Sequence, residues 1–268
     1  MKFADAEQSY EESDFIIFGI PYEDVEMSFR KGTKEAPDFI RYVSWDYESY
    51  NIINGIDLQE IAIHDAGNFE IEEAKKFIKR INDDGKIAIA IGGAHSITPF
   101  LISYLDGDYG VVVLDAHLDF RNEYLGSKTS HACSIRRIFE KVGKNRVITI
   151  GTRSASKEEI EEARNLGLRY FTSWEYEKAI NEIPFDKIYL SLDIDVFDPC
   201  YAPGVSNPEP VGLGYEIFDF IKDVAKKIVA MDIVEVCPPY DDGRASLLAA
   251  KIIRDFIAWR NKISQIFK

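Results

Sequence analysis

The feature that most constrains the fold is a repeated pattern. A short run of apolar, mostly β-branched residues is followed by a turn and then by an amphipathic segment. Within the runs, hydrophobic residues occupy consecutive positions, which is typical of parallel strands covered on both faces. We expect strands at 15–20, 86–91, 111–115, 146–150, 187–195 and 228–236, and helices near 69–82, 97–105, 132–141, 156–166, 173–181, 214–226 and 243–262. This alternation predicts an α/β fold with three layers, α/β/α, and a mainly parallel sheet.

Composition and charge predict one soluble domain spanning 1–268. The chain has 46% hydrophobic residues, and no Gly/Ser-rich linker divides it. Its formal net charge of −14 argues against nucleic acid and anionic membranes as partners and suits a small cationic substrate. No apolar stretch reaches the ~18 residues of a spanning helix, and the first residues do not resemble a secretory signal. Three scattered cysteines make a disulfide framework improbable, so we expect a cytoplasmic protein.

Acidic and imidazole side chains recur at the ends of the expected strands. The carboxyl ends of parallel strands form one edge of the sheet, where α/β folds place their chemistry. Four strands bring such groups to that edge: His95 after IAIAI, Asp115, His117 and Asp119 after VVVL, Asp193 and Asp195 after IYLSL, and Glu235 in MDIVEV.

The segment Asp115-Ala-His117-Leu-Asp119 needs a bend if all three polar side chains share one site. Residues two apart on a strand lie on one face about 6.6 Å apart, but a fully extended chain would separate Asp115 from Asp119 by about 13 Å. We therefore expect the chain to curl away from the strand near His117. Alone, this segment could equally be a solvated loop, and aspartates are common at strand ends.

Taken together, the six residues predict a metal centre. Four carboxylates crowded at one edge are costly unless protons or cations neutralise them, and two divalent ions would balance four charges. Oxygen ligands outnumber imidazoles and no thiolate is present, which favours Mn²⁺ over structural zinc. A pair of such ions lowers the pKa of a shared water and makes it a nucleophile, so hydrolysis is the expected reaction.

Four segments carry a resemblance to a known family. They are GGAHSIT, VVVLDAHLDFRNEYLGSKTSHACSIRRI, YLSLDIDVFDPCYAPGVSNPEP and DIVEVCPPYDDGRASLLAAKII, and the likeness extends upstream through GIPYEDVEMSFRKGTKEAPDFIRYVSWDYESYN. They resemble the ureohydrolase (arginase/agmatinase) family, especially prokaryotic and archaeal agmatinases. DAHLD and SLDIDVFDPCYAPG are the most specific segments, while GGAHS alone is weak.

The resemblance implies an arginase-like fold and two Mn²⁺ per subunit. It also implies cleavage of agmatine to putrescine and urea by a metal-bridging hydroxide, a step of polyamine biosynthesis, in a homo-oligomer that is a trimer or hexamer. One ion would be held by His95, Asp115, Asp119 and Asp193, and the other by His117, Asp115, Asp193 and Asp195.

The resemblance also implies catalytic roles for three residues. Asp119 would accept a proton from the hydroxide, His131 would shuttle protons, and Glu235 would bind the guanidinium. Imidazole titrates near neutral pH, and a carboxylate can pair with a planar guanidinium through two hydrogen bonds. Without the resemblance, His131 could instead bond locally in a loop and Glu235 could form a buried salt bridge.

Some features depart from the family pattern, and other functions stay open. Ala94 stands where the family usually has Asp, Glu or Asn, which affects the orientation of His95, and Cys237 stands where arginases carry Asn.

Arginine, guanidinobutyrate and formimidoylglutamate are alternative substrates of the same class. A non-catalytic subunit that binds metal or guanidine is a different class, disfavoured because every expected ligand is present. A deacetylase-type metallohydrolase is disfavoured because such enzymes lack the full two-metal ligand set.

Overall fold

The core of the protein is one sheet of eight parallel strands. The computed structural model describes residues 1–24 and 28–266. In spatial order the strands are β4 (Ile63–Asn68), β1 (Phe15–Gly19), β5 (Ile87–Ile91), β10 (Ile228–Val234), β9 (Ile188–Asp193), β6 (Gly110–Leu114), β7 (Val147–Thr152) and β8 (Arg169–Thr172). Every neighbouring pair in this sheet is parallel. The six predicted strands are all present and form the centre of the sheet.

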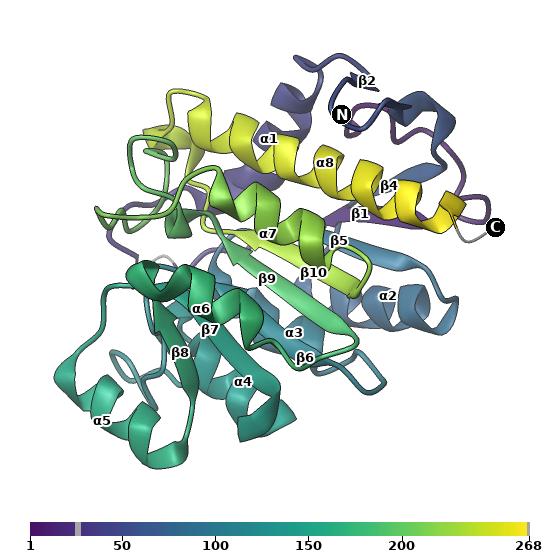
Figure 1. Ribbon diagram of the computed structural model, residues 1–268. Coiled ribbons are helices and arrows are strands. Elements are labelled where there is room, and N and C mark those ends of the chain that lie inside the picture. The colour runs from purple at the N-terminus through teal and green to yellow at the C-terminus, as the bar shows by residue number, and fades with distance from the viewer. Residues whose placement is uncertain (25–27, 267–268) are drawn as a thin grey trace.

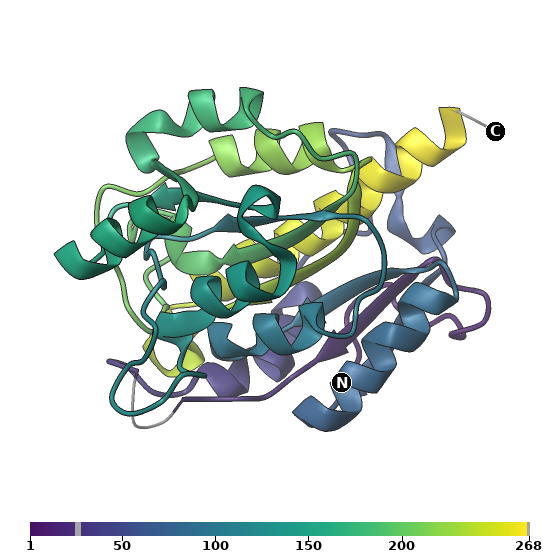
Figure 2. The ribbon, with the colours of Figure 1, turned by 90° about the horizontal axis from the view of Figure 1, so that it is seen from below.

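Helices cover both faces of the sheet and make the three layers (Figures 1 and 2). One face packs against α1 (Ala36–Ser44), α6 (Tyr176–Asn181), α7 (Glu216–Val224) and α8 (Arg244–Ile266). The other face packs against α2 (Ile71–Asp83), α3 (Thr98–Ile102), α4 (Ser134–Val142) and α5 (Lys157–Leu166). A short antiparallel pair, β2 (Tyr50–Asn51) and β3 (Ile56–Asp57), lies outside the main sheet. The predicted α/β/α class is confirmed.

Burial explains why the central strands are continuously apolar. All five residues of β1 and of β6 are buried, because helices pack on both sides of them. The amphipathic segments become helices with identifiable ends. Ser156 and Glu159 form a capping box at the start of α5, and Gly167 ends that helix in the left-handed conformation.

Besides β2 and β3, two strands of the main sheet and one helix were not predicted. Strands β4 and β8 occupy the two edges of the sheet, where a strand needs no continuous apolar run, and their sequences are IHDAGN and RYFT. Helix α1 lies within a segment that contains Pro37, which its first turn accommodates. Among the described residues no helix has the length and apolar character needed to cross a membrane.

Candidate metal centre and substrate pocket

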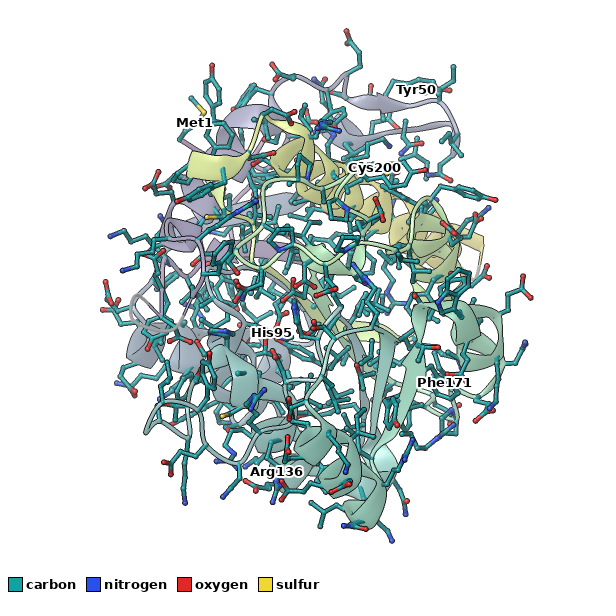
Figure 3. All side chains as sticks on the ribbon, turned by 90° about the vertical axis from the view of Figure 1, so that its left-hand side faces the viewer. Met1, Tyr50, His95, Arg136, Phe171 and Cys200 are labelled. Atoms are coloured by element: carbon teal, nitrogen blue, oxygen red, sulfur yellow. The ribbon has the colours of Figure 1, made fainter. Side chains whose placement is uncertain are left out.

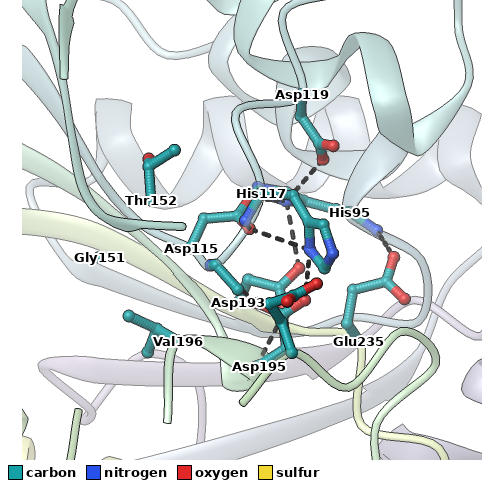
Figure 4. A network of polar contacts seen from close by, with 12 residues as sticks. His95, Asp115, His117, Asp119, Gly151, Thr152, Asp193, Asp195, Val196 and Glu235 are labelled. Carbon is teal, nitrogen blue, oxygen red and sulfur yellow. Dashed lines mark hydrogen bonds and ion pairs between the residues drawn. The ribbon is translucent and has the colours of Figure 1, made fainter. Parts of the chain in front are cut away.

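The predicted site residues converge where the four central strands end. Strands β5, β10, β9 and β6 are adjacent in the sheet, and each is followed at its carboxyl end by one or more of these residues. His95 lies near the middle of the molecule in Figure 3. Figure 4 shows the surrounding aspartates grouped about the two imidazole rings. The fold therefore places side chains from four separate segments within one cluster.

A close backbone approach brings His95 into this cluster. After β5 the chain passes through Gly93, where a Cβ atom would lie 1.9 Å from the carbonyl oxygen of Tyr22, so glycine is required. The imidazole Nδ1 of His95 then lies 3.1 Å from Oδ2 of Asp115 and 3.3 Å from Oδ2 of Asp193. The His95 side chain is fully buried.

The expected curl after His117 is present and brings Asp119 back to the site. The Leu118 backbone N–H donates to the Ser154 carbonyl, and Asp119 adopts a left-handed backbone conformation with φ 46°. As a result the Asp119 carboxylate lies 3.7 Å from Nδ1 of His95. A positive φ at a residue other than glycine is unfavourable and is common at functional sites.

The ligand atoms form two groups that share Asp115. His95, Asp115 and Asp119 offer three atoms that all lie within 4.8 Å of one another, and Asp115, His117 and Asp195 form a second such group. In the second group, Nδ1 of His117 lies 2.8 Å from Oδ2 of Asp195 and 3.7 Å from Oδ1 of Asp115. Each of the two neighbouring groups could hold one ion.

The donor set fits a pair of divalent cations. Nδ1 of His95 and Oδ2 of Asp115 are buried and have no hydrogen-bond partner. Burial and the charges of neighbouring aspartates raise the pKa of Asp115 and of Asp193 above the usual carboxyl range. Such crowding is unfavourable for the ionised form without positive charge between the groups. These residues could hold two cations, which would neutralise the carboxylates and use the unpartnered atoms.

A buried polar network orients His95 from the side opposite the cluster. Its Nε2 lies 3.2 Å from the Ser191 hydroxyl, which donates to Asp232 at 2.7 Å. Asp232 also accepts hydrogen bonds from the hydroxyls of Thr98 and Tyr189. Ser191 and Asp232 are register partners on β9 and β10, and both are fully buried. A hydroxyl and a carboxylate therefore fix the ring even though Ala94 supplies no polar group.

Sequence reasoning missed this network, although a signal was available. Ser191 interrupts the apolar run of β9, and Asp232 interrupts that of β10. A polar residue inside a strand that is buried on both faces must find a polar partner.

Glu235 and His131 lie beside the cluster, where they could contact a bound substrate. Glu235 follows β10 and also has a positive φ, 65°. One of its oxygens accepts the His95 backbone N–H at 2.6 Å, and the other accepts the Ser206 hydroxyl. Burial raises the pKa of Glu235, while nearby His131 and the Ser206 hydrogen bond oppose that shift. His131 begins a short 3₁₀ helix, His131–Cys133, whose preceding residue Ser130 caps it.

A pocket of about 650 Å³ opens onto these groups. Its lining includes the predicted site residues His117, Asp119, Asp193, Asp195, His131 and Glu235, together with Phe29, Leu125, Glu159 and Glu209. Glu159 is paired with Arg121 at 3.1 Å, whereas the structure gives the Glu209 carboxylate no hydrogen bond or ion pair with any described residue. His64 does not line this pocket, and its Nδ1 lies 2.7 Å from the Gln8 carbonyl oxygen.

Comparison with known proteins agrees with this architecture. The model of the arginase family matches residues 13–258. The agmatinase of Pyrococcus horikoshii is 34% identical over 260 residues, covering 90% of each chain. The N(1)-aminopropylagmatine ureohydrolase of Thermococcus kodakarensis is 32% identical over 263 residues, covering 91% of this chain and 89% of that protein.

A solved structure, that of the agmatine ureohydrolase of Thermoplasma volcanium, superposes with a TM-score of 0.95 at 38% identity. The match covers 100% of this chain and 96% of that one. The predicted family is thus confirmed. The chain belongs to the arginase family and is a hydrolase of the ureohydrolase type.

Proposed function

We propose that the protein hydrolyses agmatine to putrescine and urea in a site that holds two Mn²⁺ ions. The observation that carries this proposal is the position of Glu235 and His131 in one pocket with two ligand groups that share Asp115. The ligand set we propose is His95, Asp115, His117, Asp119, Asp193 and Asp195. Bound there, the cations would supply a water of lowered pKa as the nucleophile.

The chain's own carboxylates would bind the substrate and accept its proton. Glu235 would pair with the planar guanidinium of the substrate through charge-assisted hydrogen bonds. The positive charge of that guanidinium would favour the ionised form of Glu235. Burial and the charge of Asp115 raise the pKa of Asp119, which makes its carboxylate a stronger proton acceptor. Asp119 would take the proton of the attacking water as the carbon–oxygen bond forms.

His131 would supply the proton that the departing amine needs. Burial lowers its pKa, but the contact with Asp24 and the charges of Glu235 and Asp119 outweigh burial and raise it to about 9. The imidazole therefore carries a proton at neutral pH. As the carbon–nitrogen bond breaks, that proton would pass to the amine nitrogen, and the hydroxyl on the former guanidinium carbon would give its proton to the same amine. The products are then an ammonium ion and neutral urea, and Asp119 would return its proton to His131.

A second substrate, N(1)-aminopropylagmatine, is favoured by the size and charge of the pocket. It extends from the proposed metal ligands to Glu209, whose carboxylate forms no close ion pair with a described residue, although the Arg153 guanidinium interacts with it at longer range. Agmatine carries one distal ammonium, and an aminopropyl extension adds a further cationic nitrogen. An acidic lining suits either substrate.

The test is urea release from a substrate panel by protein reconstituted with Mn²⁺. We expect release from agmatine or its aminopropyl derivative, and little from arginine, guanidinobutyrate or formimidoylglutamate. Glu235→Gln should abolish release, whereas Glu72→Gln, at an exposed surface position, should not change it. Arginine as the preferred substrate would refute the substrate assignment. No urea from any guanidine would refute the proposed reaction.

We also propose that the protein acts in the cytoplasm as a homo-oligomer, a trimer or a hexamer. The support is the family resemblance together with the scattered cysteines and the acidic charge. Light scattering of the purified protein would give the mass directly, and a monomeric mass would refute the assembly.

A further inference from the structure

A carboxylate from the segment after β1 contacts His131 at two atoms. Oδ2 of Asp24 accepts the His131 backbone N–H at 2.8 Å and lies 3.5 Å from the ring Nδ1. The two residues are 107 positions apart in the chain. Asp24 is 9% exposed and His131 is 8% exposed, so the contact lies within the protein and not at its surface.

The surroundings of the ring make its two nitrogens different. Nδ1 is buried and has no hydrogen bond, and Asp24 is its ion-pair partner. The ring lines the pocket and packs against the Tyr124 ring in a T-shaped arrangement, with ring centroids 6.3 Å apart. With Nδ1 turned toward Asp24, Nε2 is the nitrogen left to face the pocket. A carboxylate beside one nitrogen favours a proton there and leaves the other nitrogen to exchange protons.

The charged and titratable groups around the pair favour an ionised Asp24. Burial raises the pKa of Asp24, but hydrogen bonding and charge from His131 outweigh it and lower the pKa overall, helped by the Ser96 hydroxyl. Tyr22 also faces Asp24, and burial together with that carboxylate raises the pKa of the phenol, which stays neutral. On the pocket side, His131 faces the charges of Glu235 and Asp119.

We propose that Asp24 is the positioning residue of His131: it holds the backbone N–H and the Nδ1 side of the ring, and so directs Nε2 at the leaving amine. The role of His131 in this statement rests on the proposed function. The contact also fixes the ring's tautomer, which is a property of the protein apart from turnover. Asp24 touches neither substrate nor reacting atoms and acts through His131 alone.

Nuclear magnetic resonance tests the contact without reference to activity. The chain has four histidines, so ¹⁵N-histidine labelling of protein loaded with diamagnetic Zn²⁺ gives a small set of ring signals, and His131→Gln identifies the one that matters. In wild type we expect a protonated Nδ1, and Nε2 as the titrating nitrogen. In Asp24→Asn the His131 pKa should fall and the Nε2-protonated tautomer should appear. An unchanged pKa and tautomer would overturn the proposal, while Asp106→Asn, at an exposed ion pair, serves as the matched control.

Kinetics with Mn²⁺-loaded protein provides the second test. Asp24→Asn should lower kcat roughly 10–100-fold with KM little changed, as for other residues that orient a catalytic group. Asp24→Glu should recover part of the loss. In a His131→Gln background, Asp24→Asn should have no further effect on kcat. Equal losses in both backgrounds would show a merely structural role and overturn the proposal.

The two proposals can fail separately. If wild type releases no urea from any guanidine, the proposed function fails, and the resonance experiment still decides the Asp24–His131 contact. If Asp24→Asn does not fold, Asp24→Glu and Asp24→Ser go through the same two tests. If none of the three variants alters the ring signals of His131, the proposal is overturned.

Discussion

Arg153 connects the pocket wall to the segment that carries the proposed metal ligand Asp195, and replacing it with lysine should destabilise both. Its guanidinium donates to six backbone carbonyls and to no carboxylate; the acceptors are Gly151, Asp195, Val196, Phe197, Glu209 and Pro210. A lysine ammonium has three N–H donors, so Arg153→Lys leaves at least three of these carbonyls without their partner.

The expected loss follows from that count. Each lost hydrogen bond lowers the free energy of unfolding by about 1 kcal/mol net. Because the side chain is half-buried, water can replace some of these bonds. We therefore expect the free energy of unfolding to fall by roughly 2–3 kcal/mol. An unfolding entropy of ~2.1 cal/mol/K per residue gives about 0.56 kcal/mol/K for this chain. Dividing the lost free energy by this entropy gives a fall in Tm of roughly 4–5 °C.

Thermal and urea denaturation of the Mn²⁺-loaded protein would measure the change, with Arg164→Lys as the control. Arg164 is exposed and lies in the last turn of α5. Because the Asp195 carbonyl is one of the acceptors, titration of the metal-free variant should also show weaker binding of Mn²⁺. A variant with the Tm and the metal affinity of wild type would refute the argument that Arg153 holds these segments together.

Four further predictions follow from the site. Chelation of the metals should lower Tm by about 10 °C relative to protein in Mn²⁺ at 100 times the dissociation constant, because each of the two proposed ions contributes about 2.7 kcal/mol by binding the folded state alone. An unchanged Tm would argue against the centre. Asp232→Asn should weaken metal binding roughly 10–100-fold by releasing His95, measured by metal titration, and wild-type affinity would contradict it. Glu209→Gln should raise KM for agmatine and for its aminopropyl derivative with kcat little changed, and an unaltered KM would exclude Glu209 from recognition. Above pH about 9, kcat should fall as His131 loses its proton, and His131→Asn should lack that dependence.

The centre of the fold was predictable from sequence because its strands are buried on both faces. A strand such as β6, GVVVL, cannot be mistaken for a surface segment, and burial fixes where it ends. Strands β4 and β8 were not predictable in this way, since an edge strand can be polar. The curl at Asp119 followed from distance alone, because an extended chain could not bring both aspartates to one site.

The contacts that orient the site were harder to predict. Asp24 lies in a loop and meets His131 only through the tertiary fold, so no local pattern indicates the pair. Arg153 similarly donates hydrogen bonds to backbone carbonyls up to 57 residues away in the chain. Every residue has a backbone carbonyl, so the sequence does not indicate which ones accept these bonds. Such contacts depend on backbone positions, which a side-chain pattern does not record.

The positive φ angles of Asp119 and Glu235 have an evolutionary consequence. A left-handed backbone costs a residue with a Cβ atom roughly 1–2 kcal/mol, least for Asn or Asp, and glycine bears almost none of that cost. At these two positions, selection for a working pocket opposes selection for a stable chain. In a duplicated copy freed from its function, drift toward Gly or Asn should therefore begin here, Glu235 first, and the buried strands should change later.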